Sequence, residues 1–95
     1  MSLLARFRRN KIDPEVARRN LLLQRGRIGE ATVLGTDVDP DGHEVLSYCY
    51  KVEGVDYETV QQLNDEQLTR KEHYLPGSQV DLRYDPRRPA NSIVV

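Results

Sequence analysis

The feature that most constrains the fold of this chain is an alternation of apolar and polar residues that begins after Gly26. Alternation with a period of two is typical of strands that bury one face. Turn-forming residues interrupt it at Asp-Pro-Asp-Gly (39–42) and at Glu-Gly (53–54), and the second interruption predicts a tight hairpin. The pattern therefore predicts five strands, over residues 27–38, 43–52, 55–59, 80–84 and 93–95.

Two other segments carry helix signals. Asp13 can cap a helix start and precedes a proline, which suits the first helical position, so we expect a helix over residues 14–25. Asn64 and Gln67 have the spacing of a capping box. That spacing predicts a short second helix over residues 65–73.

The order of these elements indicates the fold class. A helix, three strands, a short helix and two strands is the layout of an OB-type barrel, and a small SH3-like barrel or an open sandwich is the alternative. We expect a mostly β fold: a small five-stranded antiparallel β-barrel with an N-terminal helix and a short helix before the fourth strand. Residues 1–26 form a basic helical N-terminal arm and residues 27–95 the barrel domain, with bulges or bends expected at Gly29 and Gly35.

Charge is distributed unevenly along the chain. Residues 1–27 hold eight basic and two acidic residues, a net charge of +6, whereas residues 28–95 hold six basic and thirteen acidic residues, a net charge of −7. Such a split is typical of an arm that contacts an anionic partner, or of an arm that packs on its own acidic body. The candidate contacts to an anionic partner are basic residues of the arm: Arg6, Arg8, Arg9, Lys11, Arg18 and Arg19.

No residue pattern supports catalysis. Cys49 has no second cysteine for a disulfide or a metal site, and its position within a strand predicts a buried packing residue. His43 and His73 have no histidine or cysteine at ligand spacing. Residues 37–42 begin like a calcium loop, but Tyr48 stands where that loop needs a bidentate glutamate. We therefore expect no enzyme activity, no cofactor and no metal site.

Four tyrosines fall on the predicted strands: Tyr48, Tyr50, Tyr57 and Tyr84. Inside a barrel such rings form core and cross-strand contacts, whereas on the surface of an OB-type barrel they could stack on bases. We favour the core, because the acidic body disfavours nucleic acid, whose binding relies on neutralising phosphates.

The sequence gives no sign of a membrane span. Its longest aliphatic run is Leu21–Leu23, whereas a spanning helix needs about 20 apolar residues. The single cysteine is compatible with a reducing compartment. We expect a cytoplasmic location, with a peripheral position at a membrane surface as the alternative.

Two groups of residues resemble a known family. One is the series Tyr48, Tyr50, Val52, Gly54 and Tyr57, and the other the series Gly77, Val80, Leu82, Tyr84, Asp85, Pro86, Pro89 and Ser92. With Gly29, Ala31 and Val33 in the first strand, their order and spacing resemble the bacterial domain-of-unknown-function family DUF3592 over residues 26–95. The resemblance implies a small β domain that is usually attached to transmembrane helices. It implies no activity, cofactor or catalytic residue.

Together these observations favour a non-enzymatic interaction module that binds a protein partner or self-associates. One alternative is an OB-type nucleic-acid-binding domain that uses the basic arm. The other is a peripheral membrane-surface domain, in which the same arm makes a weak contact with anionic lipid.

Overall fold

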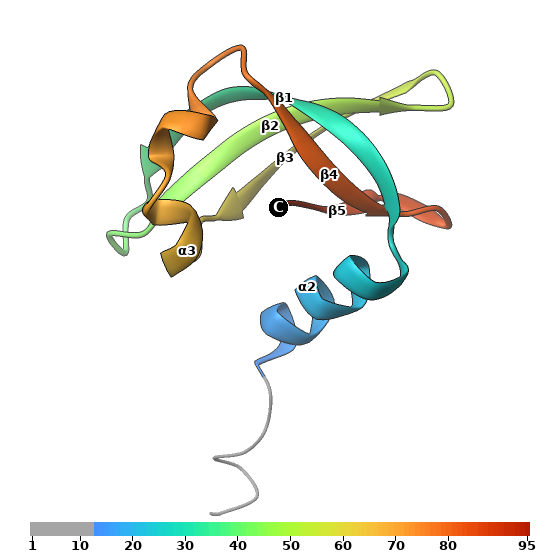
Figure 1. Ribbon diagram of the computed structural model, residues 1–95, viewed down its shortest axis with the longest axis horizontal. Helices are drawn as coiled ribbons and strands as arrows, with labels where there is room; N and C mark the ends of the chain where they lie inside the picture. The colour runs from blue at the N-terminus through green and yellow to red at the C-terminus, as the bar shows by residue number, and fades with distance from the viewer. Residues whose placement is uncertain (1–12) are drawn as a thin grey trace, which may run out of the picture.

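A computed structural model describes residues 13–95 and has eight elements along the chain (Figure 1). They are α2 (Pro14–Arg25), β1 (Arg27–Val38), β2 (Glu44–Val52), β3 (Val55–Gln62), α3 (Asp65–Leu68), the 3-10 helix η1 (Lys71–Tyr74), β4 (Gln79–Asp85) and β5 (Arg88–Val94). The helix predicted over residues 14–25 is confirmed. Four predicted contact residues lie outside the described part of the chain: Arg6, Arg8, Arg9 and Lys11.

The five strands form one antiparallel sheet in the order β3-β2-β1-β4-β5. The sheet curls until its two outer strands, β3 and β5, approach each other, which gives a nearly closed barrel (Figure 1). The predicted fold class, a mostly β five-stranded antiparallel barrel with an N-terminal helix and a short helix before β4, is confirmed. The choice between an OB-like and an SH3-like barrel stays a prediction.

The two glycines of β1 have different roles. The register of β1 with β2 shifts between Val33 and Gly35, so the bulge predicted at Gly35 is confirmed. No bulge forms at Gly29, because the pairing of β1 with β4 continues without a shift past this residue. A Cβ atom at Gly29 would instead lie 3.2 Å from the ring of Tyr84. Gly29 therefore allows a tyrosine ring to lie against the backbone of β1.

The predicted hairpin between β2 and β3 is present. Glu53 and Gly54 both have positive φ, at 50° and 81°, as a two-residue hairpin turn of the primed type requires. The turn joins Val52 and Val55, which are cross-strand partners. It therefore sets the register of both strands.

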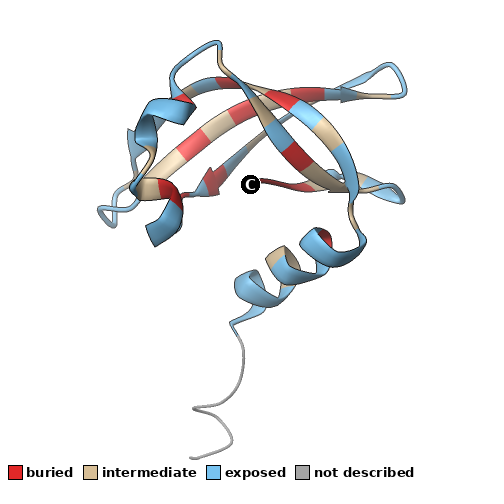
Figure 2. Ribbon diagram, in the orientation of Figure 1, coloured by how far each residue is buried: buried red, intermediate tan, exposed pale blue. Residues whose placement is uncertain are grey.

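The core lies inside the barrel and follows the alternation of the strands (Figure 2). In β2, Leu46, Tyr48 and Tyr50 are buried, and the residues between them are not. The last strand departs from the prediction, because β5 spans Arg88–Val94 and not residues 93–95. Its first half carries a proline and no apolar alternation, so the sequence pattern missed it.

The capping box predicted for the second helix is formed. The Asn64 side chain accepts a bond from the Gln67 backbone N–H at 2.8 Å, and the Asn64 N–H donates to the Gln67 side chain at 3.1 Å. The α-helix is shorter than predicted, because Arg70 leaves helical geometry at φ −135° and ψ 46°. The chain then continues as η1, which brings Tyr74 into the core.

Candidate interaction surfaces

Helix α2 lies beside the open edge of the barrel, and its contacts with the barrel are mainly polar (Figure 1). Within this fully described helix of twelve residues, Leu22 alone is buried. Burying one leucine contributes about 1.5–3 kcal/mol, and a helix of this length is marginal in isolation. Polar contacts therefore decide how α2 sits on the barrel.

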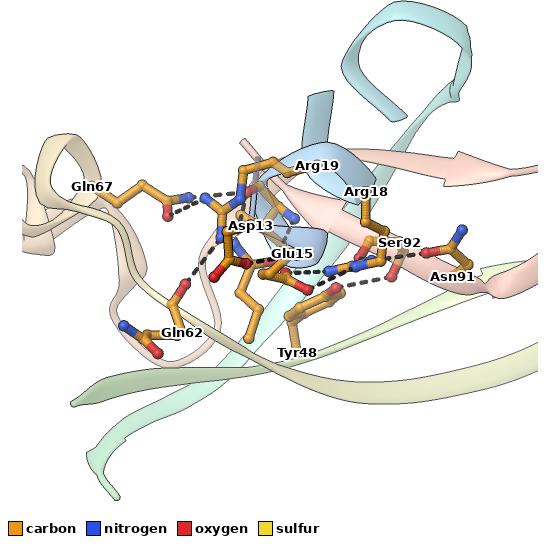
Figure 3. Close-up of polar contacts among 11 residues, drawn as sticks. Asp13, Glu15, Arg18, Arg19, Tyr48, Gln62, Gln67, Asn91 and Ser92 are labelled. Atoms are coloured by element: carbon orange, nitrogen blue, oxygen red, sulfur yellow. Dashed lines mark hydrogen bonds and ion pairs between the residues drawn. The ribbon is translucent and has the colours of Figure 1, made fainter. Parts of the chain in front are cut away.

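Arg18 makes the most extensive of these contacts (Figure 3). It forms a two-pronged ion pair with Glu15, at 2.7 and 3.0 Å, and Nη1 donates to Asn91 Oδ1 at 2.8 Å and to the Ser92 carbonyl at 3.0 Å. The hydrogen bond from Arg18 lowers the pKa of Glu15 below its usual value. The same bond raises the pKa of Arg18, which keeps the guanidinium charged.

Two further arginines fix the helix at other points. Arg19 donates to Gln67 Oε1 at 3.3 Å and to the Gln62 carbonyl at 3.2 Å. Arg83 of β4 donates to the Leu23 carbonyl at 3.0 Å. This carbonyl lies near the C-terminal end of α2, where the helix dipole favours a positive charge. The two predicted contact residues that the structure describes, Arg18 and Arg19, thus both point toward the barrel.

The distribution of charge on α2 is the reverse of that on an ordinary surface helix. Its charged residues fall on the half turned toward the barrel: Glu15, Arg18, Arg19 and Arg25. The opposite half, which we call the outer side of α2, carries only uncharged residues: Val16, Ala17, Asn20, Leu21, Leu23 and Gln24. Val16, Leu21 and Leu23 are 49%, 53% and 38% exposed.

A second candidate surface is the seam between β3 and β5, which in the described chain are joined by side chains and not by a backbone ladder. Gln61 of β3 accepts from the Val94 N–H at 2.7 Å and donates to the Val94 carbonyl at 3.0 Å. Gln67 donates to the same carbonyl at 2.9 Å. The amide of Gln61 thus takes the place of a paired strand residue at this end of the seam.

Tyrosines bridge the rest of the seam from inside. The Tyr48 hydroxyl bonds Ser92 Oγ at 2.8 Å, and the Tyr50 hydroxyl donates to the Pro89 carbonyl. Burial raises the pKa of Tyr48 to about 12. Tyr48 and Tyr50 are buried and stacked with ring centroids 5.9 Å apart, so their predicted place in the core is confirmed.

One stretch of β3 turns backbone groups away from β2 and toward the seam. In antiparallel pairs, residues alternate between bonding the neighbouring strand and pointing away from it. The two-residue turn makes Val52 and Val55 a bonded pair, so the N–H and C=O groups of Asp56, Glu58 and Val60 point away from β2. A groove of about 410 Å³ lies between the end of β3, from Thr59 to Gln62, and residues 90–92 of β5, and it reaches Glu15 of α2.

Cys49 departs from its predicted burial. It is partly exposed, because it belongs to the outward-facing residues of β2, and its cross-strand neighbours are Thr32 and Glu58. The absence of a catalytic role for Cys49 stays a prediction.

The β1–β2 loop gathers three groups that can bind metals. Within residues 13–95, Asp39, Asp41 and His43 are the one such set, with ligand atoms within 4.8 Å of one another. Asp39 Oδ1 accepts from the backbone N–H groups of Asp41 and His43, at 3.0 and 2.8 Å, which is ordinary turn chemistry. The calcium-loop pattern of residues 37–42 included Asp39 and Asp41 but not His43, and its first residue, Asp37, bonds the Val38 N–H instead.

Among the described helices, none is both long and apolar enough to cross a bilayer.

The fold and its surfaces define a small, nearly closed β-barrel with a helix docked at its seam. The chain matches the family described as Domain of unknown function (DUF3592) over residues 25–95, and it belongs to that family. Neither the curated proteins nor the solved structures contain a match to it. The family match begins at the last residue of α2, so it covers the whole barrel and leaves the rest of that helix outside.

Proposed function

We propose that this chain is a non-enzymatic interaction module that self-associates through the outer side of α2. The observation that carries the proposal is the reversed charge distribution of this helix. Its charged side chains contact or face the barrel, and its solvent side holds three partly or largely exposed aliphatic residues, Val16, Leu21 and Leu23. Such an arrangement leaves apolar area to bury against another surface.

A second copy of the helix fits this surface better than a bilayer does. Asn20 and Gln24 lie in the middle of the outer side, between the aliphatic residues. In a pair of antiparallel helices these amides can hydrogen-bond across the interface while the aliphatic residues pack around them. A bilayer surface favours basic residues beside the apolar stripe, but Arg18 and Arg19 are bonded to the barrel side.

Sedimentation velocity of the full chain over a wide range of protein concentration tests the proposal. We expect a monomer–dimer equilibrium that Val16→Ser combined with Leu21→Ser weakens about tenfold or more, because both remove apolar contacts. Leu75→Ser is a matched control, since Leu75 is 60% exposed and belongs to the segment after η1 and not to α2. A chain that stays monomeric at every concentration would contradict the proposal.

The membrane-surface alternative has its own test. Co-sedimentation with anionic vesicles at low and high salt measures the contribution of the basic arm, since screening at about 0.3 M salt weakens such contacts. Binding at low salt that is lost without residues 1–12 would support this alternative and show that the arm contacts lipid. The cytoplasmic location and the nucleic-acid alternative stay predictions, but the burial of Tyr48 and Tyr50 removes two rings from a stacking surface.

A further inference from the structure

The side chains along the exposed edge of β3 determine which kind of strand could pair with it. Asp56 and Glu58 carry their side chains on the outer face of the sheet, and Val60 follows them there with 58% exposure. The backbone groups of the same three residues point into the seam. An added strand would therefore meet two carboxylates and one aliphatic side chain at alternate positions.

These carboxylates also argue against the pairing of two β3 edges. An antiparallel pair of identical edges would bring Asp56 and Glu58 of both copies together, and like charges on facing strands are destabilising. Lys51 Nζ lies 3.7 Å from Asp56 Oδ1. This ion pair is weak because both side chains are largely exposed to solvent. The edge thus disfavours its own copy and favours a strand with basic residues at alternate positions.

The N-terminal segment of this chain has that pattern. It reads Leu-Ala-Arg-Phe-Arg over residues 4–8, with basic residues at the alternate positions 6 and 8. Set antiparallel to β3, its outer-face pairs join opposite charges or two aliphatic side chains: Arg6 with Glu58, Arg8 with Asp56, and Leu4 with Val60. On the inner face the same register places Phe7 opposite Tyr57, which stacks on Tyr50 at 5.3 Å.

We propose that residues 4–8 of one copy add to the β3 edge of a second copy as an antiparallel strand. This inference rests on the self-association proposed above and names a second part of the same interface. Because each copy offers one arm and one edge, a two-fold pair would exchange both arms reciprocally and close.

The reach of the chain favours exchange over folding back. Asp56 and Gln62 are six residues apart on β3, which is about 20 Å. The start of α2, Asp13, lines one groove together with Gln62. Only five Cα steps join Arg8 to Asp13, a span of at most about 18 Å. On its own barrel, this register would require the chain to reverse after Arg8 and return along β3 toward Gln62 within these five steps, which the arm of a second copy does not have to do.

Charge reversal in two variants of the full chain tests the exchange. The first variant carries Arg6→Glu and Arg8→Glu, and the second carries Asp56→Arg and Glu58→Arg. Each alone places like charges opposite each other, so we expect its dimer to be weakened about tenfold or more in sedimentation velocity. An equimolar mixture restores opposite charges in both seams of a mixed dimer, so we expect it to dimerise like the unmodified chain.

The outcomes separate this inference from the proposed function. If the unmodified chain dimerises and both reversed variants dimerise equally well, the strand exchange is wrong and association through α2 stands. If the variants are monomeric and remain so when mixed, the exchange is also wrong. If the unmodified chain never dimerises, both the strand exchange and the proposed self-association are wrong.

A covalent readout locates the contact. In a Cys49→Ser background, Arg6→Cys with Glu58→Cys should give a disulfide-linked dimer on mild oxidation, because directly opposed strand residues lie about 5.5 Å apart at Cα. Arg6→Cys with Glu53→Cys is the matched control, since Glu53 lies in the hairpin turn beyond the edge. Equal cross-linking of the two pairs would contradict the register.

Discussion

The barrel and helix α2 turn different kinds of side chain toward the interior. In β2, the buried residues alternate with more exposed ones, and the three buried residues are Leu46, Tyr48 and Tyr50. In α2, the residues that point toward the barrel include Leu22 and also Arg18 and Arg19, while three other aliphatic residues face outward. The barrel is thus stabilised by its own core, whereas α2 is held in place by a few hydrogen bonds and keeps apolar area for another contact.

The largest expected difference between the two regions concerns two leucines. Leu46 is fully buried, so Leu46→Ala should lower the free energy of unfolding by about 2–5 kcal/mol. Leu21 is 53% exposed, so Leu21→Ala should change it by about 0.5 kcal/mol or less. Urea unfolding at low protein concentration measures both values. Equal losses would show that α2 belongs to the core of the barrel.

The second prediction concerns pH and the interior of the barrel. The pKa of Tyr48 is raised by burial to about 12, so the folded state favours the neutral phenol. The neutral phenol therefore contributes roughly 2–3 kcal/mol to the free energy of unfolding. This contribution is complete below pH 10, where tyrosine is neutral in the unfolded chain as well, and it is lost as the pH rises to about 12. Tyr48→Phe should flatten the fall of stability over this range. An unchanged slope would show that Tyr48 does not govern alkaline unfolding.

The third prediction concerns the seam. Gln61→Ala leaves the buried N–H of Val94 without its partner, which should cost about 1–3 kcal/mol of unfolding free energy. Gln62→Ala is the adjacent control, because the Gln62 side chain is exposed and only its carbonyl bonds Arg19. Chemical denaturation compares the two variants. A loss at Gln62 as large as that at Gln61 would contradict the side-chain closure of the barrel.

The smallest expected effect concerns the docking of α2. Arg18→Ala removes the contacts with Asn91 and Ser92, so α2 should exchange its amide hydrogens faster, with a global loss of only about 1 kcal/mol. Asn20→Ala, on the outer side, should leave α2 docked. Faster exchange throughout the barrel in Arg18→Ala would mean that α2 and the barrel unfold as one unit.

The same contrast explains what the sequence could predict. Alternation located the strands, and the spacing of Asn64 and Gln67 located the capping box, because both signals are local. The start of β5 at Arg88 was missed, since its residues carry no alternation.

The sequence could not show how α2 docks. Arg18 is a surface residue by type, and its partner Asn91 lies 73 residues later in the chain. The closure of the seam by Gln61 is likewise a long-range contact of a polar residue. Polar contacts between distant segments leave no period in the sequence, so only the folded structure shows them.

Amide hydrogen exchange of the full chain at low and at high protein concentration tests the central claim most directly. If α2 keeps its outer side for a second copy, its amides should become more protected as concentration rises, while those of β2 in the core stay unchanged. Protection of α2 that is the same at both concentrations would contradict the account.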